Sequence, residues 1–253
     1  MSNKREREKR REERLQQESS VDTKDRRKRL LQLGSAAVFI AIAAVVVLIV
    51  VTGTGDDDGG DVNLEEVSAA NQLLDGIPQE DLVLGDPKAK VTLIEFGDLQ
   101  CPVCAQYADE VLPPVIEDAV KSGEAKIDFR NFTIIGPQSA TAAAAAIAAG
   151  EQGRGWYFLE IFYHNQGAEN AGYADDAFLE AVAKAAGVED LAKWNKDRKS
   201  KTAQKQVQKG FNEAQKFGFE GTPSFAIEGP NAEGGIELLG TTTDLQESIE
   251  EAG

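Results

Sequence analysis

Apolar residues along the chain follow two different periods, and the change from one to the other marks out the elements. Residues 91–96 are mostly apolar and β-favouring with a single carboxylate, Glu95, which is the pattern of a buried strand with one exception. Alternation with a period of two predicts three further strands, at residues 125–132, 224–228 and 236–239. The last two would be joined by a turn over residues 229–235.

Helical periodicity governs the stretch between the second and third strands. Residues 138–217 are almost wholly helical in pattern and include an alanine-rich helix at 141–149, begun by Ser139 or Thr141 and ended by Gly150. The large apolar residues fall on three helix faces and are expected to form core rather than a ligand site. These residues are Trp156, Phe158, Ile161 and Phe162, then Phe178, Leu179 and Val182, then Leu191 and Trp194.

Two more helices are expected, one after the first strand and one at the C-terminus. The first is expected to end near residue 122 and to bend at the proline pair 113–114, where two ring nitrogens cannot donate hydrogen bonds. The second is expected over residues 243–250, with Thr242 or Thr243 as its cap. Strands and helices together predict an α/β fold.

An uncharged stretch near the N-terminus separates two parts of opposite charge. Residues 1–30 hold 12 Lys and Arg against 7 Asp and Glu, so of the 27 and 43 in the whole chain the remainder holds 15 and 36. No charged residue occurs from 30 to 55, and residues 33–52 would span about 30 Å as a helix. The sequence therefore predicts one transmembrane helix within residues 30–52.

The charges on either side of this stretch predict its orientation. Basic residues at 24–29 precede it and Asp56, Asp57 and Asp58 follow it, so the positive-inside rule makes residues 1–29 a cytoplasmic basic tail. A cleaved signal peptide is the alternative, but the apolar run exceeds the ~7 to 15 residues of a signal core and lacks an Ala-x-Ala site. The basic tail is interrupted by glutamates and has no aromatic residue, so we expect no nucleic-acid partner.

The rest of the chain divides into a linker and one folded domain. Residues 52–61 are rich in Gly and Asp and would form a flexible tether, so we assign 53–80 to a linker. Residues 81–253 then form the domain. We expect that domain to lie outside the cytoplasm, attached to the cell membrane by a single pass.

Both cysteines of the chain lie just after the first strand, in the motif Cys101-Pro102-Val103-Cys104. Pro102 suits the first position of a helix, which puts Cys101 at a helix N-terminus, where free N–H groups and the helix dipole favour the thiolate. Cys104, three residues on, lies on the same helix face within reach of a disulfide. The pair therefore predicts a reversible two-electron couple that needs no other cofactor.

The two cysteines also fit a structural zinc site or burial as small hydrophobic residues. A structural zinc site needs four ligands of Cys or His type, and the chain offers only the two cysteines and His164. Burial as small hydrophobic residues remains open, although the strand, turn and helix around the motif favour a redox role. His164 is interpreted as a helix-end or surface residue rather than a catalyst.

Residues 84–104, LGDPKAKVTLIEFGDLQCPVC, resemble the DsbA-like thioredoxin-fold oxidoreductases, especially the membrane-anchored ones of Gram-positive, actinobacterial type. The resemblance implies a thioredoxin fold with a mixed central sheet and a helical insertion at about 136–218. It also implies that Glu95 assists proton transfer beneath the disulfide. Gly221-Thr222-Pro223-Ser224-Phe225 matches the family's cis-proline loop, which carries over Thr222 and Pro223. The chain departs from the family's best-known oxidants at Val103, where they have histidine.

These observations predict a thiol-disulfide oxidoreductase that acts on exported cysteine-containing proteins, with Cys101 attacking and Cys104 resolving. A disulfide-forming oxidase is preferred, with a membrane quinone-linked partner to re-oxidise it. A reductase or isomerase would use the same residues with a less acidic cysteine. An alternative of another class is a tethered module that binds Cu(I) or acts as a chaperone.

Overall fold

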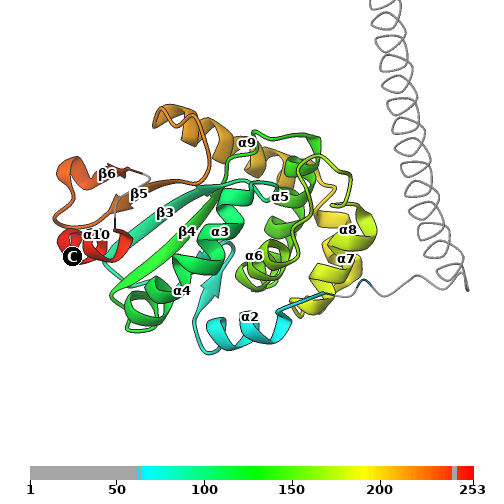
Figure 1. Ribbon diagram of the computed structural model, residues 1–253, viewed down its shortest axis with the longest axis horizontal. Coiled ribbons are helices and arrows are strands. Elements are labelled where there is room, and N and C mark those ends of the chain that lie inside the picture. Colours follow the sequence, from blue (N-terminus) through cyan, green and yellow to red (C-terminus); the bar gives the residue numbers. More distant parts are fainter. Residues whose placement is uncertain (1–61, 63, 241–243) are drawn as a thin grey trace, which may run out of the picture. The chain divides into compact units, whose positions relative to one another are not determined.

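The computed structural model describes residues 62, 64–240 and 244–253 (Figure 1). The predicted basic tail and transmembrane helix, at 1–29 and 30–52, lie outside these residues. Within the described part of the chain, no helix is long and apolar enough to cross a membrane.

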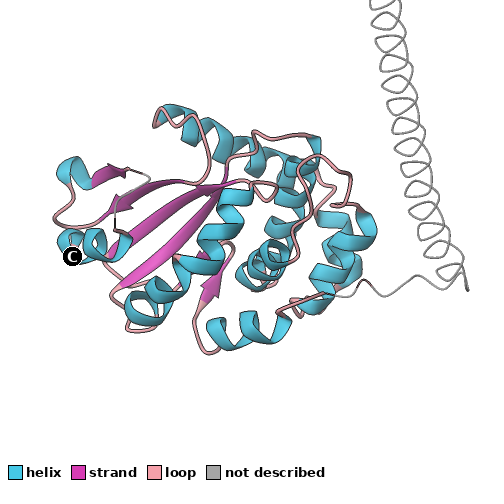
Figure 2. Cartoon of the chain, in the orientation of Figure 1, coloured by secondary structure: helices cyan, strands magenta, loops and turns pink. Residues whose placement is uncertain are grey.

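A six-stranded mixed sheet forms the centre of the domain (Figure 2). Its strand order is β1-β2-β4-β3-β5-β6, with β3 parallel to β4 and antiparallel to β5. The predicted strands at 125–132, 224–228 and 236–239 are confirmed with at most one residue of difference. The strands are β1 (Gln79–Glu80), β2 (Val83–Leu84), β3 (Val91–Gly97), β4 (Ala125–Asn131), β5 (Ser224–Glu228) and β6 (Ile236–Leu239).

Helices follow the first long strand, fill the stretch between β4 and β5, and close the chain. The helix after β3 bends at the proline pair, as predicted, so that α3 is followed by the short α4 and one π-helical turn, η1. The insertion between β4 and β5 is mainly helical, as predicted, although residues 165–175 between α6 and α7 form a loop. The helices are α2 (Val67–Leu74), α3 (Pro102–Glu110), α4 (Leu112–Val115), η1 (Ile116–Val120), α5 (Pro137–Gly150), α6 (Gly155–His164), α7 (Asp176–Ala185), α8 (Leu191–Asp197), α9 (Lys201–Lys216), the 3-10 turn η2 (Glu233–Gly235) and α10 (Leu245–Ala252).

Alternation along β3 sends its side chains to two differently covered faces. Ile94 and Phe96 belong to a small apolar cluster that includes Ala214 of α9. Leu93 belongs to the main core, which contains residues of α3, α6 and α10. The next residue on that second face is Glu95. The predicted buried strand is therefore covered on both sides, and its carboxylate points toward α3 and α6.

The aromatic residues of the insertion form core, as the sequence predicted. Trp156 and Trp194 are fully buried, and each indole N–H finds a carbonyl acceptor 2.9 Å away, at Leu82 and Ala145 respectively. The Phe158 ring packs against Trp194, with its centroid 6.4 Å from that of Trp194. Because both indole N–H groups are hydrogen-bonded to the backbone and the rings pack inside the core, these residues form core rather than a ligand site.

Three predicted boundaries are wrong, each for a local reason. Helix α5 begins at Pro137, with Gly136 as N-cap, because Pro137 fits the first helical position; Ser139 instead accepts a hydrogen bond from the Gly136 N–H at 3.3 Å. Helix α10 is capped by the Asp244 carboxylate, which accepts from two backbone N–H groups. Residues 67–80, assigned to the linker, belong to the domain, because Leu74 of α2 is fully buried and β1 pairs with β2.

Candidate active site

The two cysteines lie at the start of α3. Cys101 is the N-cap residue with extended backbone angles, and Pro102 is the first helical residue, as the sequence predicted. Cys104 is fully buried one turn on, whereas Cys101 retains slight exposure. Both are free thiols, so the structure corresponds to the reduced state. One cysteine thus reaches the surface and the other lies beneath it.

The surroundings of Cys101 favour its thiolate. A hydrogen bond from the Cys104 thiol is the largest influence, joined by the Thr222 side chain and the backbone N–H groups of Cys104 and Val103. Together they outweigh burial and lower the pKa of Cys101 to about 6. At neutral pH the reduced protein therefore carries a charged sulfur at the first turn of α3.

Cys104 is affected in the opposite direction. Burial raises its pKa far above the ordinary value, and its hydrogen bond to Cys101 and the negative charge of the Cys101 thiolate raise it further. The pair therefore holds one thiolate and one thiol, and Cys104 must lose a proton before it can attack. A proton acceptor near Cys104 is needed for exchange.

The peptide bond between Thr222 and Pro223 is cis, as the resemblance implied. It brings the Thr222 carbonyl oxygen to within 3.3 Å of Cys101 Sγ, which donates to it as a thiol. Strand β5 begins at the next residue, Ser224, and pairs with β3. The pairing of these strands therefore places a residue 121 positions away beside the reactive sulfur.

Glu95 lies beneath the cysteines with its side chain 1% exposed. Its neighbours across the sheet are Phe129 and Phe225, and Phe225 stacks on Tyr107 of α3 with centroids 5.5 Å apart. Its Oε1 has no hydrogen-bond partner within the described part of the chain. Burial raises the pKa of Glu95 to about 8, so the carboxyl is protonated at neutral pH and can exchange a proton near it.

Asp98 is a buried carboxylate that sequence reasoning missed. It accepts hydrogen bonds from the backbone N–H groups of Gln100, Ile134 and Ile135, at 2.9, 2.8 and 3.0 Å. These bonds tie the loop before Cys101 to the loop after β4. Asp98 directly follows the strand, which is the only signal in the sequence, since its partners lie 36 and 37 residues away.

Glu160 is a second buried carboxylate that the sequence reasoning did not single out. It is the only acidic residue of α6, whose sequence GWYFLEIFYH is otherwise apolar apart from the terminal His164. A single carboxylate in an otherwise apolar helix is the sequence feature that could have pointed to Glu160. The last residue of the helix, His164, places Nδ1 2.7 Å from Asp109 Oδ1, in agreement with its predicted helix-end position.

Val103, between the cysteines, is 47% exposed. Its side chain offers Cys101 neither charge nor hydrogen bond, although its backbone N–H does. Among the described residues, no group of three or more His, Cys, Asp or Glu side chains is placed to hold a metal ion.

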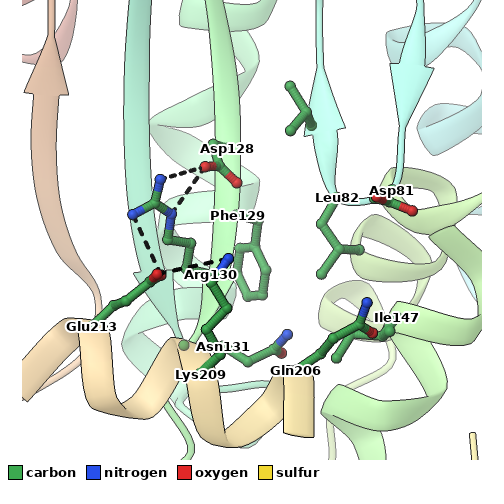
Figure 3. A pocket seen from close by; sticks show the side chains of 12 residues that line it. Asp81, Leu82, Asp128, Phe129, Arg130, Asn131, Ile147, Gln206, Lys209 and Glu213 are labelled. Carbon is green, nitrogen blue, oxygen red and sulfur yellow. Dashed lines mark hydrogen bonds and ion pairs between the residues drawn. The ribbon is translucent and has the colours of Figure 1, made fainter. Parts of the chain in front are cut away.

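A separate pocket of about 230 Å³ lies between β4 and α9 (Figure 3). Arg130 donates from Nε and Nη2 to Asp128 Oδ2 at 2.9 and 2.8 Å, and its Nη1 lies 3.5 Å from Glu213 Oε2. Lys209 Nζ lies 3.8 Å from Glu213 Oε1, so the basic groups of the pocket are paired with acidic ones. No residue of the cysteine motif lines the pocket. It is not part of the redox site.

Comparisons with known proteins agree with this site. The family profile described as "Thioredoxin" matches residues 78–250. "Probable disulfide bond formation protein D" of Bacillus cereus is 33% identical over 149 residues, which is 58% of this chain and 69% of that protein.

Solved structures agree in fold. Oxidised BdbD from Bacillus subtilis superposes with a TM-score of 0.60 at 22% identity, over 70% of this chain and 97% of that one. A thioredoxin-like oxidoreductase from Silicibacter pomeroyi gives a TM-score of 0.53 at 26% identity, over 72% and 94%. The expected thioredoxin fold with a helical insertion is therefore confirmed. The chain belongs to the thioredoxin family, and within that family it is a DsbA-like thiol-disulfide oxidoreductase.

Proposed function

We propose that the protein is a disulfide-forming oxidase in which Cys101 and Cys104 form the disulfide that is donated to substrates. The observation that carries the proposal is the environment of Cys101, whose thiolate is stabilised by the start of α3 and by the Cys104 thiol. Stabilising the thiolate favours the reduced enzyme, and this makes the disulfide a stronger oxidant.

The reaction begins when a substrate thiolate attacks Cys101 Sγ of the Cys101–Cys104 disulfide. The new bond joins the substrate sulfur to Cys101, the old disulfide breaks, and its electron pair goes to Cys104. Glu95, protonated at neutral pH, gives its proton to Cys104. A second substrate thiolate then attacks the substrate sulfur of the mixed disulfide and Cys101 leaves as a thiolate. The substrate loses two electrons and the enzyme gains them.

Thr222 and Pro223 would hold the substrate during this exchange. The Thr222 carbonyl lies beside Cys101 Sγ, where an extended substrate segment can pair with the backbone before β5. Exposed Val103 adds an apolar contact at the edge of the same surface. The site therefore suits an unfolded or extended cysteine-containing chain better than a small thiol.

Substrates of this kind are exported proteins, since disulfides form outside the reducing cytoplasm. The charge step across residues 30–52 supports a single-pass anchor of Gram-positive type, with residues 1–29 in the cytoplasm and the domain outside. A membrane quinone-linked partner would then return the enzyme to its disulfide form. Protease added to intact spheroplasts should remove the domain and spare a tag at residue 1, and the reverse result contradicts this orientation.

Cys104→Ser tests the roles of the two cysteines. In Cys104→Ser the Cys101 thiolate can still attack a substrate disulfide, and the mixed disulfide that forms has no Cys104 thiol to release it. Cells that express the variant should therefore accumulate covalent complexes that a reductant dissolves. Cys101→Ser is the matched control and should form none. Complexes formed equally by both variants would contradict the assignment of Cys101 as the attacking residue.

The Cu(I)-binding alternative has a direct test. Two soft thiolates could hold Cu(I), but Cys104 is a buried thiol with a raised pKa and His164 is paired with Asp109. The purified full-length chain should lose added Cu(I) to a competing chelator while its exchange activity persists. Retention of one Cu(I) per chain, with exchange abolished, would favour the binding module.

A further inference from the structure

Glu160 lies in the core without the partners that a buried carboxylate normally has. Its side chain is 1% exposed, and its Oε2 has no hydrogen-bond partner among the residues described. An apolar side chain at this position of α6 would avoid the cost of an unpaired buried polar group. The residue therefore weakens the fold locally, and its placement calls for another explanation.

Helix geometry directs Glu160 toward the space beneath the cysteines. Residues three and four positions apart share a helix face, so Glu160 lies on the same side of α6 as Tyr163 and His164. His164 pairs with Asp109 of α3, and the Tyr163 ring lies 6.5 Å from that of Phe129 in β4. This side of α6 therefore faces α3 and the central strands, and α3 and α6 run close together (Figure 1).

Glu95 enters the same space from the sheet. It lies beside Phe129 in the strand register, on the face that Tyr163 contacts. Glu95 and Asp109 are the two carboxyl groups whose charges raise the pKa of Glu160. Glu95 in turn interacts with Cys104, while the Asp109 side chain is 61% exposed. Burial and these electrostatic interactions order four groups from the buried sulfur to the surface: Cys104, Glu95, Glu160 and Asp109.

We propose that Glu160 is the second member of a proton relay, which connects Glu95 beneath the cysteines to solvent at Asp109, on the surface between α3 and α6. The inference rests on the proposed role of Glu95 in disulfide exchange. Glu160 touches neither sulfur, so it acts as a positioning residue that supplies and receives the proton of Glu95.

The proton balance follows from the exchange reaction. When the disulfide opens, Cys104 gains an electron pair and takes the proton of Glu95, which becomes a carboxylate. Glu160 gives its proton to Glu95 and regains one from water at Asp109. During re-oxidation the relay runs outward. Glu160 releases its proton to water at Asp109 and takes the proton of Glu95, and Glu95 then takes the proton of Cys104, which attacks as a thiolate. Only one of the two carboxyl groups needs to be charged at any time.

The surrounding groups support this behaviour. Burial is the main cause that raises the pKa of Glu160 to about 8, and the negative charges of Glu95 and Asp109 raise it further. Burial raises the pKa of Glu95 to the same range, and Tyr163, from the same face of α6, stays neutral because its pKa is also raised. Two acids of matched pKa transfer a proton between them at little cost, and near pH 8 they titrate as a coupled pair.

The test compares Glu160→Gln with wild type in the full-length chain purified in detergent. The rate at which glutathione reduces the oxidised enzyme is followed across the pH range that brackets both carboxyl pKa values. In wild type the rate, divided by the fraction of glutathione present as thiolate at each pH, should fall in two steps as the pair ionises. Glu160→Gln should remove the upper step and slow exchange about tenfold. Glu110→Gln, which removes an exposed carboxylate from α3, is the matched control and should follow wild type.

A double variant separates a relay from a purely structural effect. Glu95→Gln removes the first member of the relay, so Glu95→Gln/Glu160→Gln should exchange no more slowly than Glu95→Gln alone. A Glu160→Gln profile that superimposes on wild type, or two effects that multiply, would overturn the proposal. If wild type itself fails to exchange with glutathione at any pH, the proposed oxidase function fails instead.

A measurement on wild type alone covers the case in which Glu160→Gln does not fold. The infrared absorption of protonated carboxyl groups should disappear near pH 8 with the amplitude of two buried acids. An amplitude of one acid would show that one of the two carboxyl groups is ionised throughout, and the relay would be refuted.

Discussion

Replacing Glu95 by glutamine should change the pH dependence of stability by an amount that the structure predicts. In the folded protein burial raises the pKa of Glu95 to about 8, against 4.5 in the unfolded chain. At pH 7 the unfolded chain has released this proton and the folded protein has kept it. The ~2.5 units between pH 7 and the unfolded-state pKa of 4.5 correspond to about 3 kcal/mol of lost stability in wild type. In the variant, the buried glutamine amide is unpaired and lowers the free energy of unfolding by about 1 kcal/mol at every pH.

The sign follows from proton counting. Between pH 4.5 and 8 the folded protein binds more protons at this site than the unfolded chain, so the free energy of unfolding falls as pH rises. Below pH 4.5 both states are protonated and the penalty vanishes. Glu95→Gln has no such proton, so its stability relative to wild type should change from about −1 kcal/mol at pH 4 to about +2 kcal/mol at pH 7.

Urea unfolding of the reduced proteins at several pH values measures this difference. Both proteins contain the same cysteines, so the titration of Cys101 largely cancels in the comparison. The same variant should exchange disulfides at least tenfold more slowly at neutral pH, because Cys104 loses its proton donor. A stability difference that stays flat from pH 4.5 to 8 would show that Glu95 does not keep its proton in the folded state, and the mechanism would lose its donor.

Two further substitutions test the loop and the helix start. Val103→His adds a hydrogen-bond donor, and below neutral pH a positive charge, beside the Cys101 thiolate. The reduction potential of the Cys101–Cys104 couple should therefore rise by about 30 mV or more, equivalent to about 1.4 kcal/mol. A fall in this potential would contradict the control of Cys101 by the start of α3. Asp98→Ala leaves three backbone N–H groups without their acceptor and should lower the free energy of unfolding by about 3 kcal/mol or more, whereas a loss below about 1 kcal/mol in urea unfolding would show that water replaces the carboxylate.

Much of the fold could be predicted because the signals are local. Alternation gives β4, β5 and β6 within a residue, and a proline after Cys101 gives the start of α3. The sequence does not identify the N-cap of α10, because three adjacent residues that favour this position, Thr242, Thr243 and Asp244, precede the amphipathic helix. The carboxylate of Asp244 reaches two backbone N–H groups, at 2.9 and 3.2 Å.

The parts of the site that escaped prediction depend on contacts between distant segments. The role of Asp98 depends on a loop that begins after β4, and that of Glu160 on the packing of α6 against α3. Periodicity places Glu160 on a helix but does not say what the helix covers. Glu95 could be predicted because a known family has a carboxylate at that place, and no such guide existed for Glu160.

The reduction potential of the Cys101–Cys104 couple is the most direct test of the central claim. It is measured by equilibrating the full-length chain with mixtures of reduced and oxidised glutathione and trapping free thiols. Stabilisation of the Cys101 thiolate predicts a potential less negative than about −200 mV, in the range of proteins that donate disulfides. A value near −270 mV, typical of a reducing thioredoxin, would contradict the oxidase function and favour the reductase.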